Sequence, residues 1–314
     1  MNKIILVGAG NIAGEYASIL KSLKVEFETV CVTKKSAESF SLKWQVPCRY
    51  GGINKAYHNS KMFNKAIIAV NIDQLFSVCN TLIEAGIKYI LIEKPGALNF
   101  IQIKELGNIS KKTKTNIFIA YNRRNYASVL KCKEFINEDG GVLSCHFEFT
   151  EWSHIIEKIN SSEEIKSNWL LANSSHVIDL AFHLIGKPKE MHNVSNGEIS
   201  WHKPSCFAGS GVTVQNVLFS YHANWQSPGR WGIEINTKKR KLILKPLEKI
   251  FVQEIGKIET NEVLEIDFST ELNFKPGYYV QTENFVKNNF EKLKSLSEQV
   301  KDIDIYKMIL GNKK

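Results

Sequence analysis

The stretch Gly8-Ala9-Gly10-Asn11-Ile12-Ala13-Gly14 decides the fold of the first part of the chain. It directly follows Lys3–Val7, a short apolar run typical of a strand, and it opens a segment in which apolar residues recur at helical spacing. In this context Gly8 permits a tight turn, Gly10 lets the backbone approach a pyrophosphate, and the small Ala13 allows close packing of helix on strand. The free N–H groups at the start of the helix then face the phosphates. The order of strand, glycine turn and helix therefore predicts a dinucleotide-binding site.

The alternation of strand and helix continues to about residue 121. Further strands are predicted at 25–32, 66–70, 89–92 and 117–120, with helices at 36–44, 72–85 and 101–109 between them. Ser36 is expected to cap the first of these helices. Alternation of this kind predicts a parallel sheet with helices on both faces. We therefore assign residues 1–121 to a Rossmann dinucleotide-binding domain.

After residue 121 the pattern changes to a few helices and a long run of strands. Helices are expected at 125–138, 169–184, 280–293 and 302–310, and strands at 142–150 and over most of 189–265. Runs of strands behind a few helices predict an α+β domain with a largely antiparallel sheet. The chain is thus predicted to be an α/β protein of two domains, residues 1–121 and residues 122–314.

Composition and charge narrow the classes of function. The 314 residues carry 41 Lys and Arg against 32 Asp and Glu, a net charge of +9, and 43% of them are hydrophobic. This balance excludes a disordered chain. The lysines are dispersed, without a basic helix or an aromatic platform, which argues against nucleic-acid binding. A positive surface of this kind favours anionic small molecules.

The sequence also bears on compartment and metal binding. No stretch approaches the ~20 apolar residues of a membrane helix, and the first apolar run ends at the glycine turn rather than at a cleavage site. The six cysteines are scattered, without Cys-x-x-Cys or clustered histidines. Neither a disulfide framework nor a metal site is therefore expected. We expect a cytoplasmic protein that does not associate with a membrane.

The residues after the second strand bear on the choice between NAD(H) and NADP(H). An NAD site normally has Asp or Glu there, about 20 residues beyond the glycine turn, but this chain has Thr33-Lys34-Lys35. Glu28 lies too early in the strand, and Glu38 is already on the next helix. A hydroxyl group followed by two ammonium groups suits a 2′-phosphate, so NADP(H) is favoured over NAD(H). Because loop lysines are often merely solvated, NAD(H) stays open as the alternative.

Three further motifs accompany the glycine turn. Glu93-Lys94-Pro95 ends a strand, Tyr121-Asn122-Arg123-Arg124 follows the next one, and His176-Val177-Ile178-Asp179 lies on a helix of the second domain. In this order and context the motifs resemble the Gfo/Idh/MocA oxidoreductases, the family of glucose–fructose oxidoreductase and inositol dehydrogenase. The resemblance covers at least residues 3–186. It implies a Rossmann domain followed by a substrate-binding and oligomerisation domain, whose open sheet often builds homodimers or homotetramers.

The resemblance also implies roles for particular residues. Lys94 maps to a lysine beside the nicotinamide and the substrate hydroxyl, and His176 maps to a general base or acid, so these two are the expected catalytic residues. His183 is interpreted as a packed side chain. The expected cofactor contacts are Gly8, Gly10, Asn11, Ile12, Thr33, Lys34, Lys35, Asn71, Glu93, Lys94 and Arg123. The expected substrate contacts are Lys94, Tyr121, Arg124, Asn173, His176 and Asp179.

One position departs from the family pattern. Sugar and inositol dehydrogenases of the family often have an aspartate four residues before the helix histidine, where this chain has Ala172. Reduction of a carbonyl, with Lys94, His176 or Tyr121 supplying the proton, therefore fits better than polyol oxidation. We expect hydride transfer between NADP(H) and a sugar or nucleotide sugar, in surface-polysaccharide metabolism. Two alternatives stay open: a reductase of a non-sugar substrate such as a tetrapyrrole, and a cofactor-sensing regulator without catalytic activity.

Overall fold

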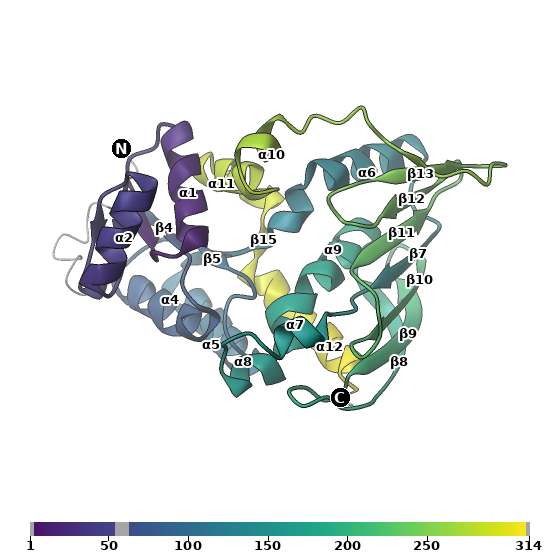
Figure 1. Cartoon of the computed structure of the whole chain (residues 1–314), viewed down its shortest axis with the longest axis horizontal. Helices are drawn as coiled ribbons and strands as arrows, with labels where there is room; N and C mark the ends of the chain where they lie inside the picture. The colour runs from purple at the N-terminus through teal and green to yellow at the C-terminus, as the bar shows by residue number, and fades with distance from the viewer. Residues whose placement is uncertain (1–2, 54–62, 312–314) are drawn as a thin grey trace. The chain divides into compact units, whose positions relative to one another are not determined.

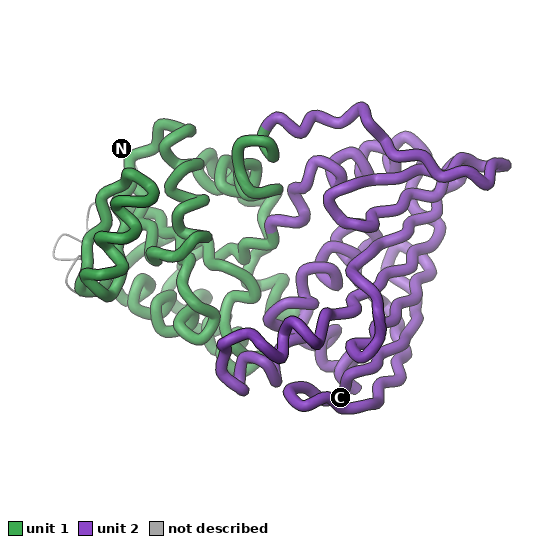
Figure 2. The backbone as a smooth tube through the Cα atoms, viewed as in Figure 1, with its two compact units in different colours: residues 1–121, 270–301 green, residues 122–269, 302–314 purple. Residues whose placement is uncertain are grey.

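The computed structural model describes residues 3–53 and 63–311. The chain forms two compact units, which are coloured separately in Figure 2. Unit 1 consists of residues 1–121 and 270–301, and unit 2 of residues 122–269 and 302–314. Residues 270–301, which the sequence analysis places in the second domain, thus belong to the first unit.

The sheet of unit 1 has the strand order β15-β6-β5-β4-β1-β2-β3. Its strands β1 to β6 are parallel and β15 is antiparallel to β6, which confirms the predicted Rossmann fold. The strand order reverses between β1 and β4, and in such sheets ligands bind at the carboxyl ends of the strands at that point. The elements are β1 (Lys3–Val7), α1 (Asn11–Ser22), β2 (Phe27–Val30), α2 (Lys34–Trp44), β3 (Cys48–Arg49), β4 (Phe63–Ile68), η2 (Ile72–Gln74), α4 (Leu75–Glu84), β5 (Tyr89–Glu93), α5 (Phe100–Thr113), β6 (Asn116–Ala120), α11 (Tyr278–Val286), η5 (Phe290–Lys292) and β15 (Lys294–Ser295).

The return of residues 270–301 to unit 1 has a packing cause. Tyr278, Phe285 and Leu293 are buried in the same apolar core as β1 and α1. The ring of Phe290 stacks on Phe118 of β6, with the centroids 4.7 Å apart. Lys65 Nζ on β4 donates to the carbonyl oxygens of Phe285 (2.9 Å) and Val286 (2.7 Å), where a cation complements the carboxyl end of α11. These contacts join segments that are far apart in the sequence.

Unit 2 contains an eight-stranded sheet with the order β14-β13-β12-β11-β7-β10-β9-β8. All of its pairings are antiparallel except the one between β7 and β10, as predicted for a largely antiparallel sheet. Figure 1 shows the strands side by side with α6 and α9 along them. The elements are η3 (Asn122–Asn125), α6 (Ala127–Glu138), β7 (Ser144–Glu148), α7 (Ser153–Ile156), α8 (Glu163–Ser167), the π-helical turn η4 (Leu170–Ser174), α9 (Ser175–Ile185), β8 (Pro188–Asn196), β9 (Cys206–Thr213), β10 (Leu218–Asn224), β11 (Gly232–Asn236), β12 (Arg240–Leu244), β13 (Phe251–Glu254) and β14 (Asn261–Glu262). Helix α10 (Ser269–Asn273) and helix α12 (Leu296–Ile309) cross the two unit boundaries near residues 270 and 301.

The two faces of this sheet differ in polarity. Along β10, Phe219 and Tyr221 are buried, whereas Ser220 and His222, which alternate with them, are not. On the polar face the ring of His146 stacks on His222 at 5.2 Å between centroids. Period-two alternation of this kind is typical of an antiparallel sheet with one covered face, and α9 packs on the covered face through β7 and β11.

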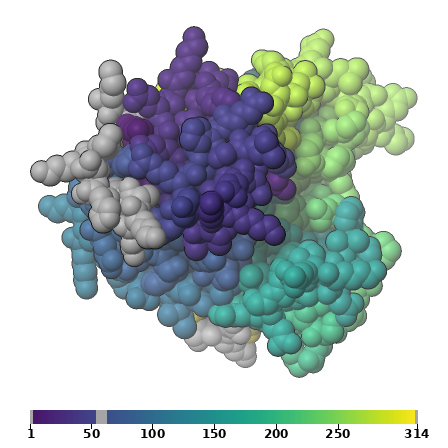
Figure 3. All heavy atoms as spheres, turned by 60° about the vertical axis from the view of Figure 1, so that its left-hand side comes forward, coloured from purple at the N-terminus to yellow at the C-terminus, as the bar shows by residue number. Residues whose placement is uncertain are grey.

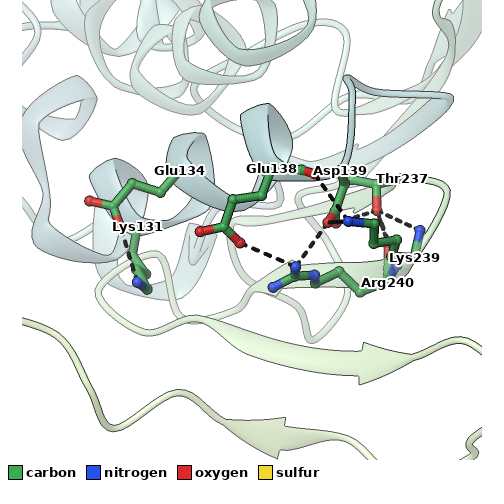
Figure 4. A network of polar contacts seen from close by, with 7 residues as sticks. All are labelled: Lys131, Glu134, Glu138, Asp139, Thr237, Lys239 and Arg240. Atoms are coloured by element: carbon green, nitrogen blue, oxygen red, sulfur yellow. Dashed lines mark hydrogen bonds and ion pairs between the residues drawn. The ribbon is translucent and has the colours of Figure 1, made fainter.

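A polar network joins α6 to the hairpin between β11 and β12 (Figure 4). The buried Asp139 accepts hydrogen bonds from Thr237 Oγ1 (2.7 Å) and Arg240 Nη2 (2.8 Å). The same Nη2 lies 3.3 Å from Glu138 Oε2, and Lys239 Nζ donates to the Glu138 carbonyl. Because a buried carboxylate needs partners of this kind, the network fixes the carboxyl end of α6 on the sheet.

Candidate active site

The glycine turn lies at the carboxyl end of β1, beside β4. Gly8 has a φ of +132°, and a Cβ atom there would lie 2.2 Å from the carbonyl oxygen of Ala69. At Gly10 a Cβ atom would meet nothing within 4 Å. The backbone itself therefore requires glycine at position 8, whereas the open space at Gly10 fits a pyrophosphate at the amino end of α1. The residues present fit a dinucleotide.

Alanine substitutions should separate these two glycines. We expect Gly8→Ala to lower the free energy of unfolding by about 2–3 kcal/mol, because its φ is strained and its methyl group meets backbone. Gly10→Ala should melt like the wild type but bind NADPH about tenfold or more weakly, since its methyl group enters the open space. Thermal melting without cofactor and a fluorescence titration with NADPH measure the two effects. Unchanged NADPH affinity in Gly10→Ala would place the pyrophosphate elsewhere.

The loop after β2 leads directly into α2. Thr33, rather than the predicted Ser36, caps this helix: its hydroxyl oxygen accepts from the Ser36 N–H at 3.1 Å. The helix consequently begins at Lys34 and places Lys34 and Lys35 in its first turn, where the helix dipole also favours anions. The side chains of this turn are exposed, and Figure 3 shows the amino-terminal elements, in purple and dark blue, at the molecular surface.

The acidic groups near this loop are engaged elsewhere. Glu28 pairs with Lys3 (2.5 Å, Nζ to Oε1) and Arg49 (3.2 Å, Nη2 to Oε2). Glu38 lies on α2, 3.7 Å from Lys34 Nζ. The structure thus presents a helix amino terminus and two lysines, and no carboxylate at the end of β2, at the position where a ribose is bound in this fold.

A hydrogen bond to Asn11 places the ammonium group of Lys43 beside the glycine turn. The exposed Asn11, in the first turn of α1, accepts a hydrogen bond from Lys43 Nζ on α2 at 2.9 Å through its Oδ1. Lys43 was not among the predicted residues, because only the packing of α1 on α2 brings it to the glycine turn. That packing depends on Gly14, where a Cβ atom would lie 1.9 Å from the Trp44 ring. Ile12 is half-buried, and the exposed Asn71 follows β4 at the same edge of the sheet.

Glu93 ends β5 inside unit 1 and takes part in a buried network. Its Oε1 accepts hydrogen bonds from the hydroxyl groups of Tyr16 (2.8 Å) and Tyr278 (3.2 Å). Gln281 Nε2 in turn donates to the Tyr16 hydroxyl at 3.1 Å. Burial raises the pKa of Glu93, opposed by the hydrogen bond from Tyr16 and by the charge of Lys94. Glu93 therefore anchors the end of the strand, and its contact with the cofactor stays a prediction.

Lys94 follows β5 at the carboxyl edge and is half-buried. The next residue, Pro95, is held by Gln299, whose Nε2 donates both to the Pro95 carbonyl oxygen (3.0 Å) and to the Tyr121 hydroxyl (3.1 Å). Tyr121 is only 2% exposed, and Lys294 Nζ lies 4.6 Å from its ring centroid. Gln299 thus links Tyr121 to the turn that carries Lys94, and the contact of Tyr121 with a substrate stays a prediction.

In unit 2 the structure brings together two predicted substrate contacts, Arg124 and Asp179. Arg124 Nε lies 2.7 Å from Asp179 Oδ2, and its Nη2 lies 2.8 Å from Oδ1, so the pair is bidentate. Both side chains are buried, at 8% and 0% exposure. Buried charges need this compensation. The pair joins η3 to α9, and contact of either group with a substrate stays a prediction.

His176 lies in the first turn of α9, directly after a π-helical turn. The Ser175 N–H donates to the Leu170 carbonyl oxygen, five residues back, so the predicted continuous helix at 169–184 contains one wider turn. π-helical turns of this kind are frequent at functional sites. His176 is 5% exposed, with its ring 6.0 Å from that of Trp231. On the same helix, burial and the charge of Arg124 lower the pKa of His183 to about 3, as suits a packed histidine.

A carboxylate that the sequence analysis missed lies beside this turn. Glu151, 1% exposed, accepts hydrogen bonds from Ser174 Oγ (2.6 Å) and from Asn173 Nδ2 (3.1 Å to each oxygen). Desolvation raises the pKa of Glu151, opposed by these hydrogen bonds and by Arg230. The helix has Ala172 where relatives often have an aspartate, but a neighbouring segment supplies a carboxylate. Its position just after the predicted strand at 142–150 was the available signal, because polar residues at strand ends often build sites.

Comparison with known proteins agrees with the fold of unit 1. Residues 2–121 match the sequence profile of a family described as "Oxidoreductase family, NAD-binding Rossmann fold", the Gfo/Idh/MocA family. The amino-terminal domain belongs to the Gfo/Idh/MocA family. No curated protein matches the sequence significantly.

Solved structures resemble the whole chain in fold. A Desulfitobacterium hafniense protein assigned as an NADPH-dependent oxidoreductase has a TM-score of 0.79 at 14% identity, covering 99% of this chain and 95% of its own. Levoglucosan dehydrogenase in complex with NADH and L-sorbose has a TM-score of 0.78 at 17% identity, with 99% and 96% covered. UDP-N-acetylglucosamine 3-dehydrogenase from Acidithiobacillus ferrooxidans has a TM-score of 0.73 at 11% identity, with 99% and 97% covered. At these identities the likeness establishes the fold alone, and it extends over unit 2 as well as unit 1.

Residues 3–53 and 63–311 contain neither a candidate membrane span nor a candidate metal site. No helix there combines the length and the apolar character needed to cross a membrane. Within the same described ranges, no group of three or more His, Cys, Asp or Glu side chains is placed to hold a metal ion.

Proposed function

We propose that the protein is an oxidoreductase that transfers a hydride between NADP(H) and a sugar-like carbonyl or alcohol. The observation that carries this proposal is the set of residues at the carboxyl edge of the unit 1 sheet. The glycine turn, the amino end of α2 and Lys94 follow β1, β2 and β5 at this edge. When bound, the dinucleotide supplies or accepts the hydride. Similar structures include enzymes that act on sugars and on a nucleotide sugar, which supports this substrate class.

The chain's own residues would handle the proton and the developing charge. Hydride transfer to a carbonyl carbon leaves negative charge on the oxygen of that carbon, and a nearby ammonium group stabilises it. Lys94 is the residue we propose for this role. A proton must then reach the oxygen, and we propose the imidazole of His176 as its donor. A homodimer or homotetramer stays a prediction.

The preference for NADP(H) rests on Thr33, Lys34 and Lys35. Titration of intrinsic tryptophan fluorescence should give a lower Kd for NADPH than for NADH. Exchange of both Lys34 and Lys35 for Ala should weaken NADPH binding about tenfold or more and leave NADH binding nearly unchanged. The matched control exchanges Lys111 and Lys112, an exposed pair in the last turn of α5, and should behave like the wild type. Tighter binding of NADH would refute the preference, and failure to bind either dinucleotide would refute the oxidoreductase itself.

NADPH consumption with a panel of keto-sugars and nucleotide keto-sugars tests the substrate class. Turnover of at least one member is the expected result. A protein that binds NADPH but turns over none of the panel would instead be a reductase of other substrates or a regulator.

A further inference from the structure

Unit 2 contains a continuous chain of aromatic and guanidinium contacts that the proposed chemistry does not use. The Arg123 guanidinium carbon lies 4.7 Å from the Trp231 ring centroid and 5.9 Å from that of Tyr126. The Arg230 guanidinium carbon lies 4.7 Å from Trp231 and 4.6 Å from Trp152. The contacts therefore run from Tyr126 through Arg123, Trp231 and Arg230 to Trp152. Arg123 lies in η3, Tyr126 precedes α6, Arg230 and Trp231 precede β11, and Trp152 lies after β7.

Stacking of this kind holds the two guanidinium groups in place without using their N–H groups. An arginine stacked on an aromatic face keeps donors in its own plane, in the fork geometry that matches phosphate or carboxylate oxygens. The arrangement is anchored, since Trp231 and Tyr126 are each 4% exposed and Trp152 Nε1 donates to the Gly229 carbonyl oxygen at 2.9 Å. Arg230 keeps a side-chain exposure of 41%, so an anion can reach it from solvent.

The charges around the chain of contacts favour an anion. Arg230 Nη1 lies 3.8 Å from Glu151 Oε2, the carboxylate that also accepts from Asn173 and Ser174. Arg124, the neighbour of Arg123 in sequence, differs because Asp179 already neutralises it. Arg123, which the family resemblance expects near the cofactor, and Arg230 thus supply two positive charges against the single carboxylate of Glu151.

Two features indicate where an anion would lie and which kind of anion would fit. The ring of Trp231 touches both guanidinium groups and also lies 6.0 Å from the His176 ring, so an anion bound here would lie near the proposed proton donor. Trp152, at the outer end, is 46% exposed and offers an aromatic surface on which a base can stack. Two guanidinium groups with an exposed indole suit a diphosphate joined to a nucleoside.

We propose that Arg123, Trp231, Arg230 and Trp152 form a binding site for the nucleoside diphosphate part of the substrate. This inference rests on the proposed function in one respect: it takes the reacting group to be a sugar joined to that diphosphate.

Calorimetry on the full chain tests the site. Uridine diphosphate and inorganic pyrophosphate are titrated into protein saturated with NADPH, so that the dinucleotide site is occupied. We expect both to bind, uridine diphosphate more tightly, and uridine alone to bind weakly. Arg230→Gln should weaken binding of uridine diphosphate about 10- to 100-fold, because a charge-assisted pair is lost, while the Kd for NADPH stays unchanged. Lys203→Gln, which removes an exposed unit 2 cation paired with Glu198, is the matched control and should bind like the wild type.

The outcomes separate the two proposals. If wild-type protein with NADPH bound takes up neither uridine diphosphate nor pyrophosphate, or if Arg230→Gln binds as tightly as the wild type, the site is refuted. Turnover of a neutral keto-sugar alongside either result would leave the oxidoreductase intact. If the protein binds no NADPH, the oxidoreductase is refuted, and the same titrations without dinucleotide still test the site. Should Arg230→Gln fail to fold, Arg230→Lys, which keeps the charge and loses the planar fork, is expected to weaken binding, and wild-type affinity in it would refute the site.

Discussion

Lys94→Ala is expected to lower kcat for carbonyl reduction about 10²- to 10³-fold while the Kd for NADPH changes less than about threefold. The kinetic loss follows from the removal of the ammonium group that we propose stabilises the developing charge on oxygen. Cofactor affinity should be retained because the phosphates are proposed to bind at the glycine turn and the amino end of α1, which follow a different strand of the sheet. Steady-state kinetics and a fluorescence titration on the same preparation measure the two quantities.

The control for Lys94 is the lysine at the other end of the same strand. Lys88 is exposed and immediately precedes β5, so Lys88→Ala removes the same charge at the amino edge of the sheet. It should leave both kcat and the Kd for NADPH unchanged. Lys94→Ala also removes the positive charge that counteracts the rise in the pKa of the buried Glu93. Any resulting loss of stability would appear as a lower melting temperature. Wild-type kcat in a well-folded Lys94→Ala would move the chemistry away from Lys94, and Tyr121 would be the next residue to test.

The parts of unit 1 that the sequence could predict are those in which neighbouring residues determine the structure. A strand, a glycine turn and a helix follow one another within residues 3–22, and each is encoded locally. The same holds for the absence of an acid after β2. Even there the cap was misassigned, because Thr33 and Ser36 are both good capping residues and only the helix start at Lys34 distinguishes them.

The pairings of unit 2 could not be predicted for a physical reason. Arg124 and Asp179 are separated by 55 positions and belong to different elements, so no periodicity connects them. The sequence predicts each singly as a substrate contact, and the ion pair that joins them is visible only in the structure. The link between Glu151 and Ser174 spans 23 positions and depends on a π-helical turn that no composition signal marks. The return of residues 270–301 to unit 1 was missed for the same reason.

These differences change the interpretation of Ala172. By sequence, its methyl group means that the carboxylate of the family pattern is missing. In the structure, Glu151 places a carboxylate against Asn173 and Ser174, next to Ala172 and in the turn that precedes His176. Loss of the aspartate at position 172 therefore does not by itself indicate a protein without catalytic activity, which weakens the regulator as an alternative.

His176→Gln is expected to lower kcat about 10²- to 10⁴-fold, the usual loss when a general acid or base is removed. If the imidazole donates the proton during carbonyl reduction, wild-type kcat falls as the pH rises, because a donor must hold its proton. The variant should lose this pH dependence as well as the rate, a result that a purely packing role would not produce.

The matched control is His183→Gln, seven residues further along α9. The pKa of His183 is lowered to about 3, so its imidazole is in the neutral form at the pH of the assay and has no imidazolium proton to donate. It should therefore keep both the rate and the pH profile of the wild type. If His176→Gln is slow but keeps the pH profile of the wild type, His176 has a positioning role and another group donates the proton. Glu151 would then be the first residue to exchange for Gln, because burial raises its pKa.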